Sequence, residues 1–410
     1  MTKVIDIKLL RQDPEMVRQL CQTRQADVDV DRLIDIDADM RKTKTHMQQL
    51  QQQRKTLQGP TVREQAIALR DEIAELDKEL RELQAEHHDL WSRLPNLLAP
   101  DTPPGQDDGD NVELKRWGQL PLFSFTPRPH DEVGARLDIL DLERGAKVSG
   151  AGFYYWKGAG ARLNWGLFSL AMDFLIERGF TPMFTPVAAK DHTLFGTGYL
   201  PFSADQIYRL ENGDVSLIGT SEQTLVGYHG AEILDPKSLP LLYTAFTPCF
   251  RTEAGSYGRA ARGAFRVHQF HKVEQIVFCH PDESETWHHT CLQYEEEFMQ
   301  LLELPYRVVR VCVGDLGAPA YKKYDVEAYF AGFGEYRETH SNTNLLDYQT
   351  RRLGIRCKEE RNTYHPHTIS ATMITDRAAL ALLENNQQED GSVQIPQALR
   401  PYLGGKEFIR

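Results

Sequence analysis

The sequence predicts an α+β protein built on an antiparallel sheet, and three observations lead to this fold class. β-Rich runs follow one another without regular helical crossovers, which favours antiparallel over parallel pairing. Two long helical stretches, Gly160–Arg178 and Asp282–Leu304, interrupt the runs. Neither a Walker motif nor a GxGxxG fingerprint occurs, so a Rossmann-type nucleotide site is not expected. The β-rich runs lie around residues 205–220, 240–252, 264–280, 305–313 and 324–340.

The composition indicates a globular protein of more than one domain. The 410 residues, 41% of them hydrophobic, supply ample material for a core. A net charge of -12 argues against a general nucleic-acid-binding surface, so any RNA contact must come from local basic patches. The N-terminal segment has no apolar h-region and is too acidic for a transit peptide, and no run is long enough to span a membrane. We expect a cytoplasmic protein without a membrane partner.

Six scattered cysteines indicate neither a zinc site nor a disulfide framework. No pair has the CxxC spacing of a metal site. Buried or inert thiols in a reducing compartment are the expected state. They are Cys21, Cys249, Cys279, Cys291, Cys312 and Cys357.

Two heptad seams near the N-terminus predict an antiparallel helical hairpin at about residues 30–95. Apolar residues recur at alternating spacings of 3 and 4, with charged residues or Gln between them. The break at Gly59–Pro60 separates two helices, and about 25 residues in each give an arm about 37 Å long. Heptads also serve dimerisation or bundle packing, so the pattern alone leaves the role of the hairpin open. The seams comprise Leu33, Ile36, Met40, Thr43, Met47, Leu50, Arg54 and Leu57, then Leu69, Ile73, Leu76, Leu80, Leu83, His87, Leu90 and Leu94.

A segment rich in Pro, Gly and Asp separates this hairpin from the rest of the chain. It runs from Pro95 to Asp110 and has the composition of a linker. We therefore expect an N-terminal domain at residues 1–100, a linker at 101–115 and a second domain at 116–410.

The segment from Cys249 to Phe278 predicts two antiparallel strands that share one polar face. Arg251 and Glu253 lie two residues apart at the end of an apolar run. Such a face offers a guanidinium for phosphate, an aromatic ring for a purine and a carboxylate for an exocyclic amine. A solvated charged ribbon fits the same alternation. The second strand carries Arg266, His268, Phe270, Lys272 and Glu274, and the loop between carries Gly255, Gly258, Arg259, Arg262 and Gly263.

This segment resembles motif 2 of the class II aminoacyl-tRNA synthetases, in the form found in seryl-tRNA synthetases. The match is FRTEAG, then RG, then RVHQFHKVE. The resemblance implies the class II fold, an antiparallel sheet flanked by helices. It also implies that the hairpin reaches the long variable arm of the serine tRNA, with shape-directed and salt-sensitive phosphate contacts. The distal half of the hairpin has a basic bias from Arg41, Lys42, Lys44, Arg54, Lys55 and Arg63.

A second resemblance concerns Gly179–Pro186, which reads GFTPMFTP. This segment is similar to motif 1, the dimer-interface element of class II enzymes, and so implies a homodimer. Without the resemblance, it fits a helix end followed by a proline-punctuated edge strand.

The family resemblance also implies a serine-binding site. Thr220, Ser221 and Glu222 lie in LIGTSEQTL, and Thr220 and Glu222 would hold the substrate amine. On local evidence, Thr-Ser-Glu is equally a helix N-cap sequence. Glu274 would accept a hydrogen bond from the serine hydroxyl, which rejects analogues that lack it. Pairing with Lys272 or with Arg266 is the alternative for Glu274.

The segment Tyr336–Leu353 matches the family without a gap and implies a magnesium site for ATP. Glu338 would coordinate Mg²⁺ with help from Ser341, because hard cations prefer oxygen ligands. The cofactor-binding set that the resemblance implies is Arg251, Thr252, Glu253, Val267, Phe270, Glu338, Thr339, His340, Ser341 and Arg377. Within it, Phe270 and Arg377 would sandwich adenine and Glu253 would read its amino group.

The last segment, Thr368–Gly405, resembles motif 3 from Ala378 onward. Asp376 suits the start of a helix over Ala378–Asn385, and Arg377 would contact the γ-phosphate. Before Arg377 the chain departs from the family, because Ser370-Ala371-Thr372 replaces the usual turn and the run is one residue short. We assign the serine contact here to Thr372, which keeps a hydroxyl.

These motifs predict a serine–tRNA ligase that forms seryl-adenylate from L-serine and ATP and then acylates tRNA(Ser). Arg251, Glu338 and Arg377 are the predicted catalytic residues, and alignment and charge neutralisation replace a side-chain nucleophile. Two other functions remain open at this point. One is a serine-activating paralogue with a non-tRNA acceptor, and the other is a non-catalytic RNA-binding paralogue.

Overall fold

The computed structural model describes residues 6–57, 62–211, 213–254, 262–360 and 362–410. The chain divides into two compact units. We call Ile5–Leu97 the arm unit, and Leu98–Arg410, with which Met1–Val4 are grouped, the body unit. The predicted break Gly59–Pro60 and the predicted loop residues Gly255, Gly258 and Arg259 lie outside the described residues.

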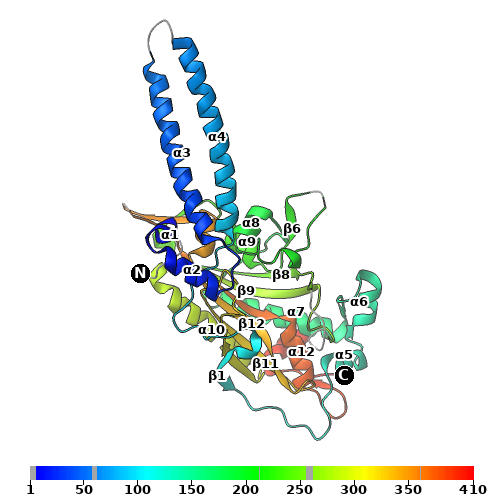
Figure 1. The fold of residues 1–410 in the computed structure, drawn as a ribbon. Helices are drawn as coiled ribbons and strands as arrows, with labels where there is room; N and C mark the ends of the chain where they lie inside the picture. Colours follow the sequence, from blue (N-terminus) through cyan, green and yellow to red (C-terminus); the bar gives the residue numbers. More distant parts are fainter. Residues whose placement is uncertain (1–5, 58–61, 212, 255–261, 361) are drawn as a thin grey trace. The chain divides into compact units, whose positions relative to one another are not determined.

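The arm unit is helical, and its two long helices run side by side (Figure 1). The hairpin prediction is confirmed: Leu33 and Ile36 are fully buried on α3, and Leu80 is buried on α4. Arg32 on α3 donates two hydrogen bonds to Glu86 on α4, at 2.7 and 2.6 Å. The α3 helix has 27 residues, which at 1.5 Å each give a length of about 40 Å. The helices are α1 Ile7–Gln12, α2 Pro14–Thr23, α3 Val30–Thr56 and α4 Val62–Ser92.

The base of the arm unit has its own small core. Leu10, Val17 and Cys21 of α1 and α2 pack with Leu33. Arg11 of α1 donates two hydrogen bonds to Asp37 of α3, at 2.8 and 2.6 Å. These bonds from Arg11 lower the pKa of Asp37, so the carboxylate stays ionised at neutral pH.

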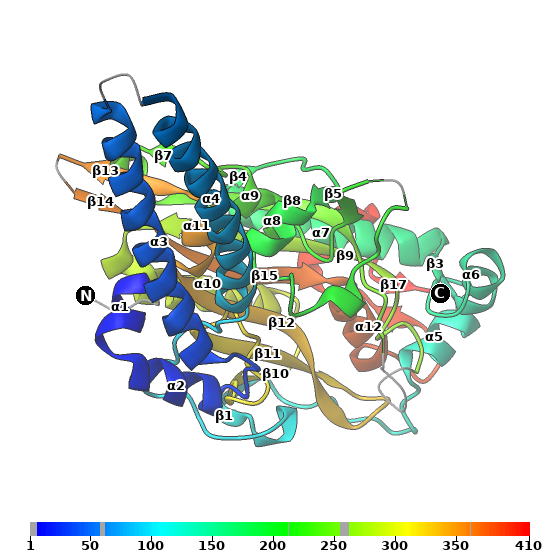
Figure 2. The same cartoon turned by 45° about the horizontal axis from the view of Figure 1, so that its top comes forward.

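The body unit is built around an eight-stranded sheet, in the order β1-β10-β11-β12-β15-β9-β8-β4 (Figure 2). Seven of its strands join in antiparallel pairs, and only the short edge strand β4 runs parallel to its neighbour β8. This confirms the predicted fold class. The strands are β1 Val112–Trp117, β4 Thr181–Pro182, β8 Leu241–Phe250, β9 Gln269–Cys279, β10 Tyr306–Arg310, β11 Lys322–Phe330, β12 Glu335–Leu346 and β15 His367–Thr375.

The two faces of the sheet are covered by different helices. On β9, Val273 and Val277 pack into a core shared with α7 Gly158–Ile176, α10 Ser284–Leu301 and α12 Asp376–Asn385. The alternate residues Ile276 and Phe278 pack with α9 Glu222–Gly227 on the opposite face. Because side chains alternate along a strand, β9 is buried on both faces.

Smaller elements complete the body unit. Its other helices are α5 His130–Arg136, α6 Leu142–Ser149, α8 Asp191–Gly196 and α11 Tyr348–Arg352. Two-stranded pairs join β2 Leu140–Asp141 to β3 Tyr155–Trp156, β5 Ala188–Lys190 to β6 Val215–Leu217, and β16 Val393–Gln394 to β17 Phe408–Ile409. A three-stranded sheet joins β7 Ile233–Leu234, β13 Arg356–Glu359 and β14 Asn362–Tyr364.

The boundary between the units differs from the predicted linker at 101–115. The division falls between Leu97 and Leu98, and Val112–Trp117 pairs with β10 as an edge strand of the main sheet. All six residues of this strand are exposed. Val112 and Leu114 alternate with polar residues, but this alternation is too short to indicate a strand by itself.

The burial of the cysteines and the character of the helices can be compared with what the composition predicts. All six cysteines are buried free thiols, as predicted, and burial raises the pKa of Cys21 to about 11. Among the described residues, no helix has the length and apolar character needed to cross a membrane.

Candidate active site

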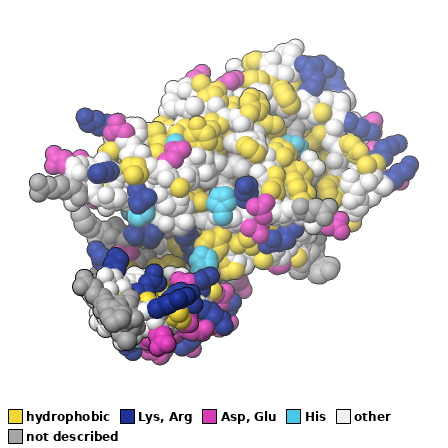
Figure 3. Space-filling view, turned by 90° about the horizontal axis from the view of Figure 1, so that it is seen from above, with side chains coloured by type: hydrophobic (Ala, Val, Ile, Leu, Met, Phe, Trp, Pro, Cys, Tyr) yellow, Lys and Arg dark blue, Asp and Glu magenta, His cyan; other side chains and the backbone are white. Residues whose placement is uncertain are grey.

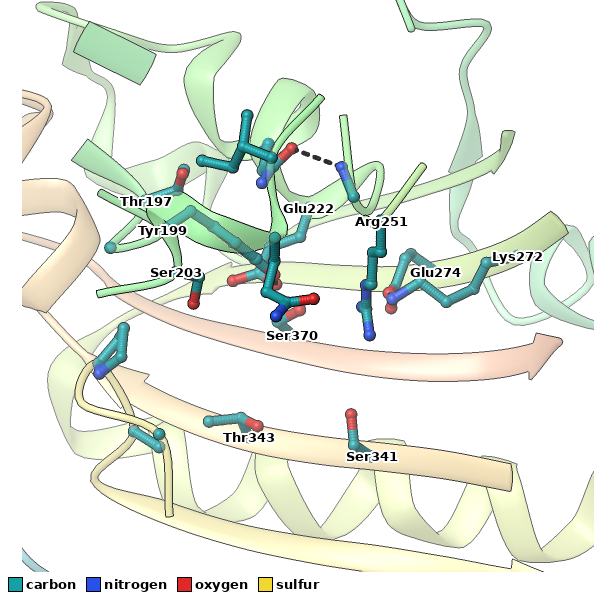
Figure 4. A pocket seen from close by; sticks show the side chains of 18 of the residues that line it. Thr197, Tyr199, Ser203, Glu222, Arg251, Lys272, Glu274, Ser341, Thr343 and Ser370 are labelled. Carbon is teal, nitrogen blue, oxygen red and sulfur yellow. Dashed lines mark hydrogen bonds and ion pairs between the residues drawn. The ribbon is translucent and has the colours of Figure 1, made fainter. Parts of the chain in front are cut away.

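A cavity of about 490 Å³ opens on the sheet face that carries α9. Figure 4 shows Arg251, Lys272 and Glu274 side by side at this cavity, with Ser341 and Thr343 pointing toward it from β12. Most of its lining is polar or charged. The lining includes Tyr199, Glu222, Arg251, Glu253, Arg266, Lys272, Glu274, Lys323, Glu338, Ser341, Thr343, Ser370 and Arg377.

The alternation of β9 places charged side chains at the cavity. Lys272 and Glu274 lie on the same face as Ile276 and Phe278, but further toward the start of the strand. The C-terminal half of this face of β9 is therefore apolar and packs against α9, whereas its N-terminal half is charged and lines the cavity. One strand thus serves both the core and the site.

Glu274 is held in a buried network at the inner end of the cavity. Its side chain is 1% exposed, and its Oε1 accepts a hydrogen bond from Thr220 Oγ1 at 2.9 Å. Lys272 forms an ion pair with the same carboxylate. Burial lowers the pKa of Lys272 to about 8, against the attraction of nearby anions, so the lysine is still charged at neutral pH. Both predicted roles of Glu274 are therefore compatible: it pairs with Lys272 and also lines the cavity.

Glu222 lies at the start of α9, where two donors orient its carboxylate. Tyr199 donates a hydrogen bond from its hydroxyl to Oε2 at 2.8 Å, and Gln349 donates one to Oε1 at 2.6 Å. Thr220 Oγ1 accepts a hydrogen bond from the backbone N–H of Glu222 at 3.3 Å, so Thr220 also has the capping role that its local sequence predicts. Ser221 takes the N-cap position without a side-chain cap bond, and its buried side chain is not part of the cavity lining.

Arg251 lines the cavity, whereas the predicted residue Phe270 does not: its ring packs against the main core and contacts Arg251. Strand β8 ends at Phe250, and the Cζ of Arg251 lies 5.2 Å from the centre of the Phe270 ring. The prediction that Arg251 and Glu253 share a strand face is wrong, because Glu253 has a φ of 49° and leaves the strand direction. Glu253 still lines the cavity and contacts Arg266 at 3.5 Å.

Arg377 lines the cavity from the first turn of α12. This helix begins just after its N-cap Thr375, so Asp376 is its first residue and not its cap. The guanidinium of Arg377 lies 4.4 Å from the centre of the Phe265 ring and donates a hydrogen bond to Glu338 Oε2 at 3.2 Å. The ring and the carboxylate together fix the orientation of the guanidinium.

Glu338 is a carboxylate that stays ionised at neutral pH. Its side chain is 46% exposed, and although the surrounding protein atoms raise its pKa, Arg377, Lys323 and Arg251 outweigh this effect and lower it to about 2. Ser341 lines the same cavity from β12. An anionic carboxylate and a hydroxyl on one strand suit a hard divalent cation. Among the described residues, no group of three His, Cys, Asp or Glu side chains could hold a metal ion, so such an ion would draw further ligands from its substrate and water.

Five further predicted residues are not among those that line the cavity. Thr252 donates a hydrogen bond to the backbone oxygen of Asp205, and Val267 belongs to the hydrophobic core. Thr339 and His340 are buried and hydrogen-bonded to each other at 2.8 Å, and burial lowers the pKa of His340 to about 4. Thr372 lies directly opposite Glu274 across the pairing of β15 with β9. None of these five side chains lines the cavity, although Thr372 lies on the same side of the sheet as Glu274.

The segment that departs from the family pattern forms the strand β15, which the sequence did not predict. A register shift between Thr372 and Ile374 accommodates Met373 as an extra residue. On this strand, Ser370 reaches the cavity lining. The alternation of β15 therefore puts Ser370 and Thr372 on the same side as Glu274.

Sequence reasoning missed four residues at the site: Tyr199, Lys323, Gln349 and Ser370. Lys323 lines the cavity and pairs with buried Asp325 at 3.0 Å. Tyr199 and Gln349 lie more than a hundred positions apart along the chain and meet only at Glu222. No local pattern reveals such a contact.

Comparisons with known proteins agree with this geometry. Residues 207–386 match the model for the tRNA synthetase class II core domain (G, H, P, S and T), and residues 4–98 match the seryl-tRNA synthetase N-terminal domain. The serine–tRNA ligase of Dictyoglomus turgidum is 43% identical over 421 residues, which covers 99% of each chain. That of Rubrobacter xylanophilus is 42% identical and covers 98% of each. Among solved structures, the seryl-tRNA synthetase of Pyrococcus horikoshii complexed with ATP has a TM-score of 0.92 at 38% identity, over 99% of each chain.

Proposed function

This chain belongs to the seryl-tRNA synthetase family, and we propose that the cavity of the body unit is where it activates serine. Its activity is that of a serine–tRNA ligase, an ATP-dependent enzyme. Similarity over 99% of the chain, N-terminal domain included, favours this function over a ligase with another acceptor or a non-catalytic paralogue. The observation that carries the site assignment is the convergence of Glu222, Arg251, Glu274, Glu338 and Arg377 on one cavity.

In the first step, the serine carboxylate attacks the α-phosphorus of ATP and pyrophosphate leaves. Arg251 neutralises charge on the α-phosphate as it develops, and Arg377 binds the far end of the triphosphate. Phe270 supplies a flat surface for adenine beside Arg251, with Glu253 reading its amino group. The reaction needs aligned reactants and neutralised charge, so no covalent nucleophile is required.

Serine binds at the opposite end, between Glu222 and Glu274. The carboxylate of Glu222, fixed by Tyr199 and Gln349, holds the ammonium group. Glu274 accepts a hydrogen bond from the serine hydroxyl, while Thr220 and Lys272 hold that carboxylate in place. Alanine would leave Glu274 without this bond, which gives discrimination by hydrogen bonding. Thr372 and the newly found Ser370 add hydroxyls on the same side of the sheet.

Magnesium is the proposed metal, held by Glu338 and Ser341 together with ATP phosphate oxygens. A magnesium ion held by these residues would supply positive charge that offsets the charge of the triphosphate. The low pKa of Glu338 keeps its carboxylate ready to bind a cation throughout the neutral range.

The arm unit is the proposed tRNA-binding element. Its α3 helix carries Arg41, Lys42 and Lys44, of which Arg41 and Lys42 contact the acids Asp37 and Asp39. Phosphates would compete with the exposed pair of Lys42 and Asp39, which is worth little in water, while the Arg41 side chain, which is mostly exposed, can turn to a phosphate. In the second step, the 3′-terminal hydroxyl of tRNA(Ser) takes the seryl group from the adenylate.

A homodimer is the proposed assembly, through the motif 1 segment Gly179–Pro186. Phe184 in this segment is fully exposed, and Trp165 on α7 is 70% exposed. Large exposed aromatic residues are typical of interaction surfaces. Figure 3 also shows apolar side chains spread over the face of the body unit that it draws. Six buried free cysteines are in keeping with the proposed cytoplasmic location.

Serine-dependent exchange of pyrophosphate into ATP tests the first step directly. We expect exchange with serine and Mg²⁺, and none with alanine, threonine or cysteine at equal concentration. Exchange that is independent of the amino acid would contradict the serine site, and no exchange with any of them would contradict activation in this cavity.

A further inference from the structure

A buried histidine–carboxylate pair lies beside the nucleotide end of the cavity. His130 is the first residue of α5, Glu384 lies in α12, and both side chains are fully buried. Nδ1 of His130 lies 2.7 Å from Glu384 Oε1, which also accepts a hydrogen bond from the backbone N–H of His130 at 2.9 Å. The second oxygen, Oε2, accepts a bond from the backbone N–H of Gly332 at 2.8 Å. Both carboxylate oxygens of Glu384 are therefore satisfied inside the core.

The hydrogen-bond network fixes the tautomer of His130. The backbone N–H of Ala264 donates to Nε2 at 3.1 Å, so Nε2 must be an unprotonated acceptor. Nδ1 must then carry the ring hydrogen and donate it to Glu384. A buried backbone N–H that loses its acceptor is costly, so Ala264 is firmly attached to this ring.

Ala264 lies next to the residue on which Arg377 rests. The Phe265 ring stacks against the Arg377 guanidinium at 4.4 Å, and its backbone oxygen accepts a hydrogen bond from Arg377 Nε at 3.4 Å. The same stretch is tied to α5 at its surface, where Arg262 donates to Asp131 at 3.2 Å and Glu132 at 2.8 Å. The segment Arg262–Phe265 is thus anchored to the N-terminal end of α5.

Glycine at position 263 permits this close approach. A Cβ on Gly263 would lie 2.2 Å from His130 Nε2, and the backbone has a φ of +70°. Any side chain here would push the segment off the histidine.

We infer that His130, oriented by Glu384, is a positioning residue for the ATP site. It fixes the backbone position of Ala264 and thereby the position of the Phe265 ring. This ring, on which the guanidinium stacks, orients Arg377 toward the cavity. Neither residue touches the substrate. This inference rests on the proposed binding of ATP by Arg377.

Two conservative variants of His130 separate positioning from simple packing. In His130→Gln, the side-chain oxygen can take the place of Nε2 and accept from Ala264. In His130→Asn, the amide takes the place of Nδ1, so the bond to Glu384 survives and the bond to Ala264 is lost. In pyrophosphate exchange we expect His130→Asn to raise the KM for ATP about tenfold, which corresponds to the free energy of one buried hydrogen bond. We expect His130→Gln to raise it about twofold. The KM for serine should stay within about twofold in both.

The control is His367→Asn. His367 is a buried histidine on β15, away from the segment Arg262–Phe265, and its Nδ1 lies 3.0 Å from Ser284 Oγ. This variant should lower the melting temperature but leave the KM for ATP unchanged. If both His130 variants raise the KM for ATP equally, or raise the KM for serine as much, His130 has only a structural role and the inference is overturned.

Two further variants keep the test decisive. If the His130 variants do not fold, Gly263→Ala displaces the same segment with the pair intact and should also raise the KM for ATP; an unchanged KM overturns the inference. Arg377→Ala tests the proposed function separately. If it leaves the KM for ATP unchanged, the role of Arg377 fails and the inference falls with it. If only Arg377→Ala raises that KM, the inference alone fails.

Discussion

At the scale of single residues, the site is a set of side chains whose charge states are set by their neighbours. Glu338 stays ionised because three cations surround it, and Lys272 has a lowered pKa because it is buried. The sequence suggested the candidate site residues through their resemblance to a family. It could not show which of them face the cavity, because Val267, Thr339 and His340 lie beside cavity residues along the chain yet point into the core.

Glu338→Gln tests the proposed metal and phosphate role. The amide keeps the shape but loses the charge, so we expect pyrophosphate exchange to fall about a hundredfold or more. More Mg²⁺ should be needed for half-maximal exchange. Glu335→Gln, at an exposed carboxylate paired with Arg337 on the same strand, is the control and should be unaffected. Equal activity of the two variants would rule out the role of Glu338.

Thr220→Val tests the network behind the serine site. Valine keeps the shape of threonine but removes the hydrogen bond to Glu274, so the KM for serine should rise about five- to tenfold while the KM for ATP stays constant. Thr244→Val is the matched control, since Thr244 is fully buried on β8 but contacts the sulfur of Met172. A parallel rise in both Michaelis constants would show that Thr220 acts on the whole site.

At the scale of elements, regular patterns were predictable and irregular ones were not. The heptad seams predicted α3 and α4, and the apolar runs predicted β8, β9 and β10. In each of these elements the buried residues recur at a fixed spacing along the sequence. The run at 324–340 proved to be two strands, β11 and β12, joined by a tight turn. Strand β15 is buried on both faces and contains a bulge, so it shows no alternation of apolar and polar residues, although five of its nine residues are Thr or Ile. The run at 205–220 holds only the short strand β6 of a separate two-stranded sheet.

Ile36→Ala should destabilise the arm unit alone. Ile36 is fully buried on α3, and removing its side chain should cost about 2–5 kcal/mol. We expect the arm to unfold at lower denaturant concentration, seen in hydrogen exchange of α3 and α4, while pyrophosphate exchange is unchanged. Gln48→Ala, at an exposed position of α3, is the control. Loss of serine activation in Ile36→Ala would show that the two units do not act independently.

At the scale of the whole molecule, the chain combines two units with separate cores. The contacts divide the chain between Leu97 and Leu98, whereas the predicted linker at 101–115 includes part of the edge strand β1. A short strand that is exposed throughout carries no signal of its pairing partner.

Removing the hairpin, residues 33–90, should separate the two steps of the reaction. Pyrophosphate exchange should remain within about twofold of the full chain, because the proposed activation residues all lie in the body unit. Acylation of tRNA(Ser) should fall at least about a hundredfold, equivalent to ~3 kcal/mol of binding. Acylation that survives the deletion would mean that the hairpin does not bind the acceptor.

The stability of the body unit should fall in mild acid. Burial lowers the pKa of His288 to about 3 and of His340 and His367 to about 4, from an ordinary value of 6.5. The unfolded chain therefore binds more protons than the folded one below pH 6.5, so stability is complete above that pH and is lost as the pH falls toward 4. Urea unfolding at pH 7 and pH 5 should show a lower midpoint at pH 5. Equal midpoints would show that these rings are accessible to protons in the folded state.

The pairing of β1 with β10 has a consequence for synthesis on the ribosome. Val112 pairs with Arg310, so the outermost strand of the sheet must wait for almost two hundred further residues to be translated. The contacts of the arm unit, such as that of Leu10 with Leu94, all lie within residues 5–97, so this unit can complete its fold long before then. During that interval the nascent body unit has an unpaired strand edge, which makes this stage of translation one at which we expect chaperones to be needed.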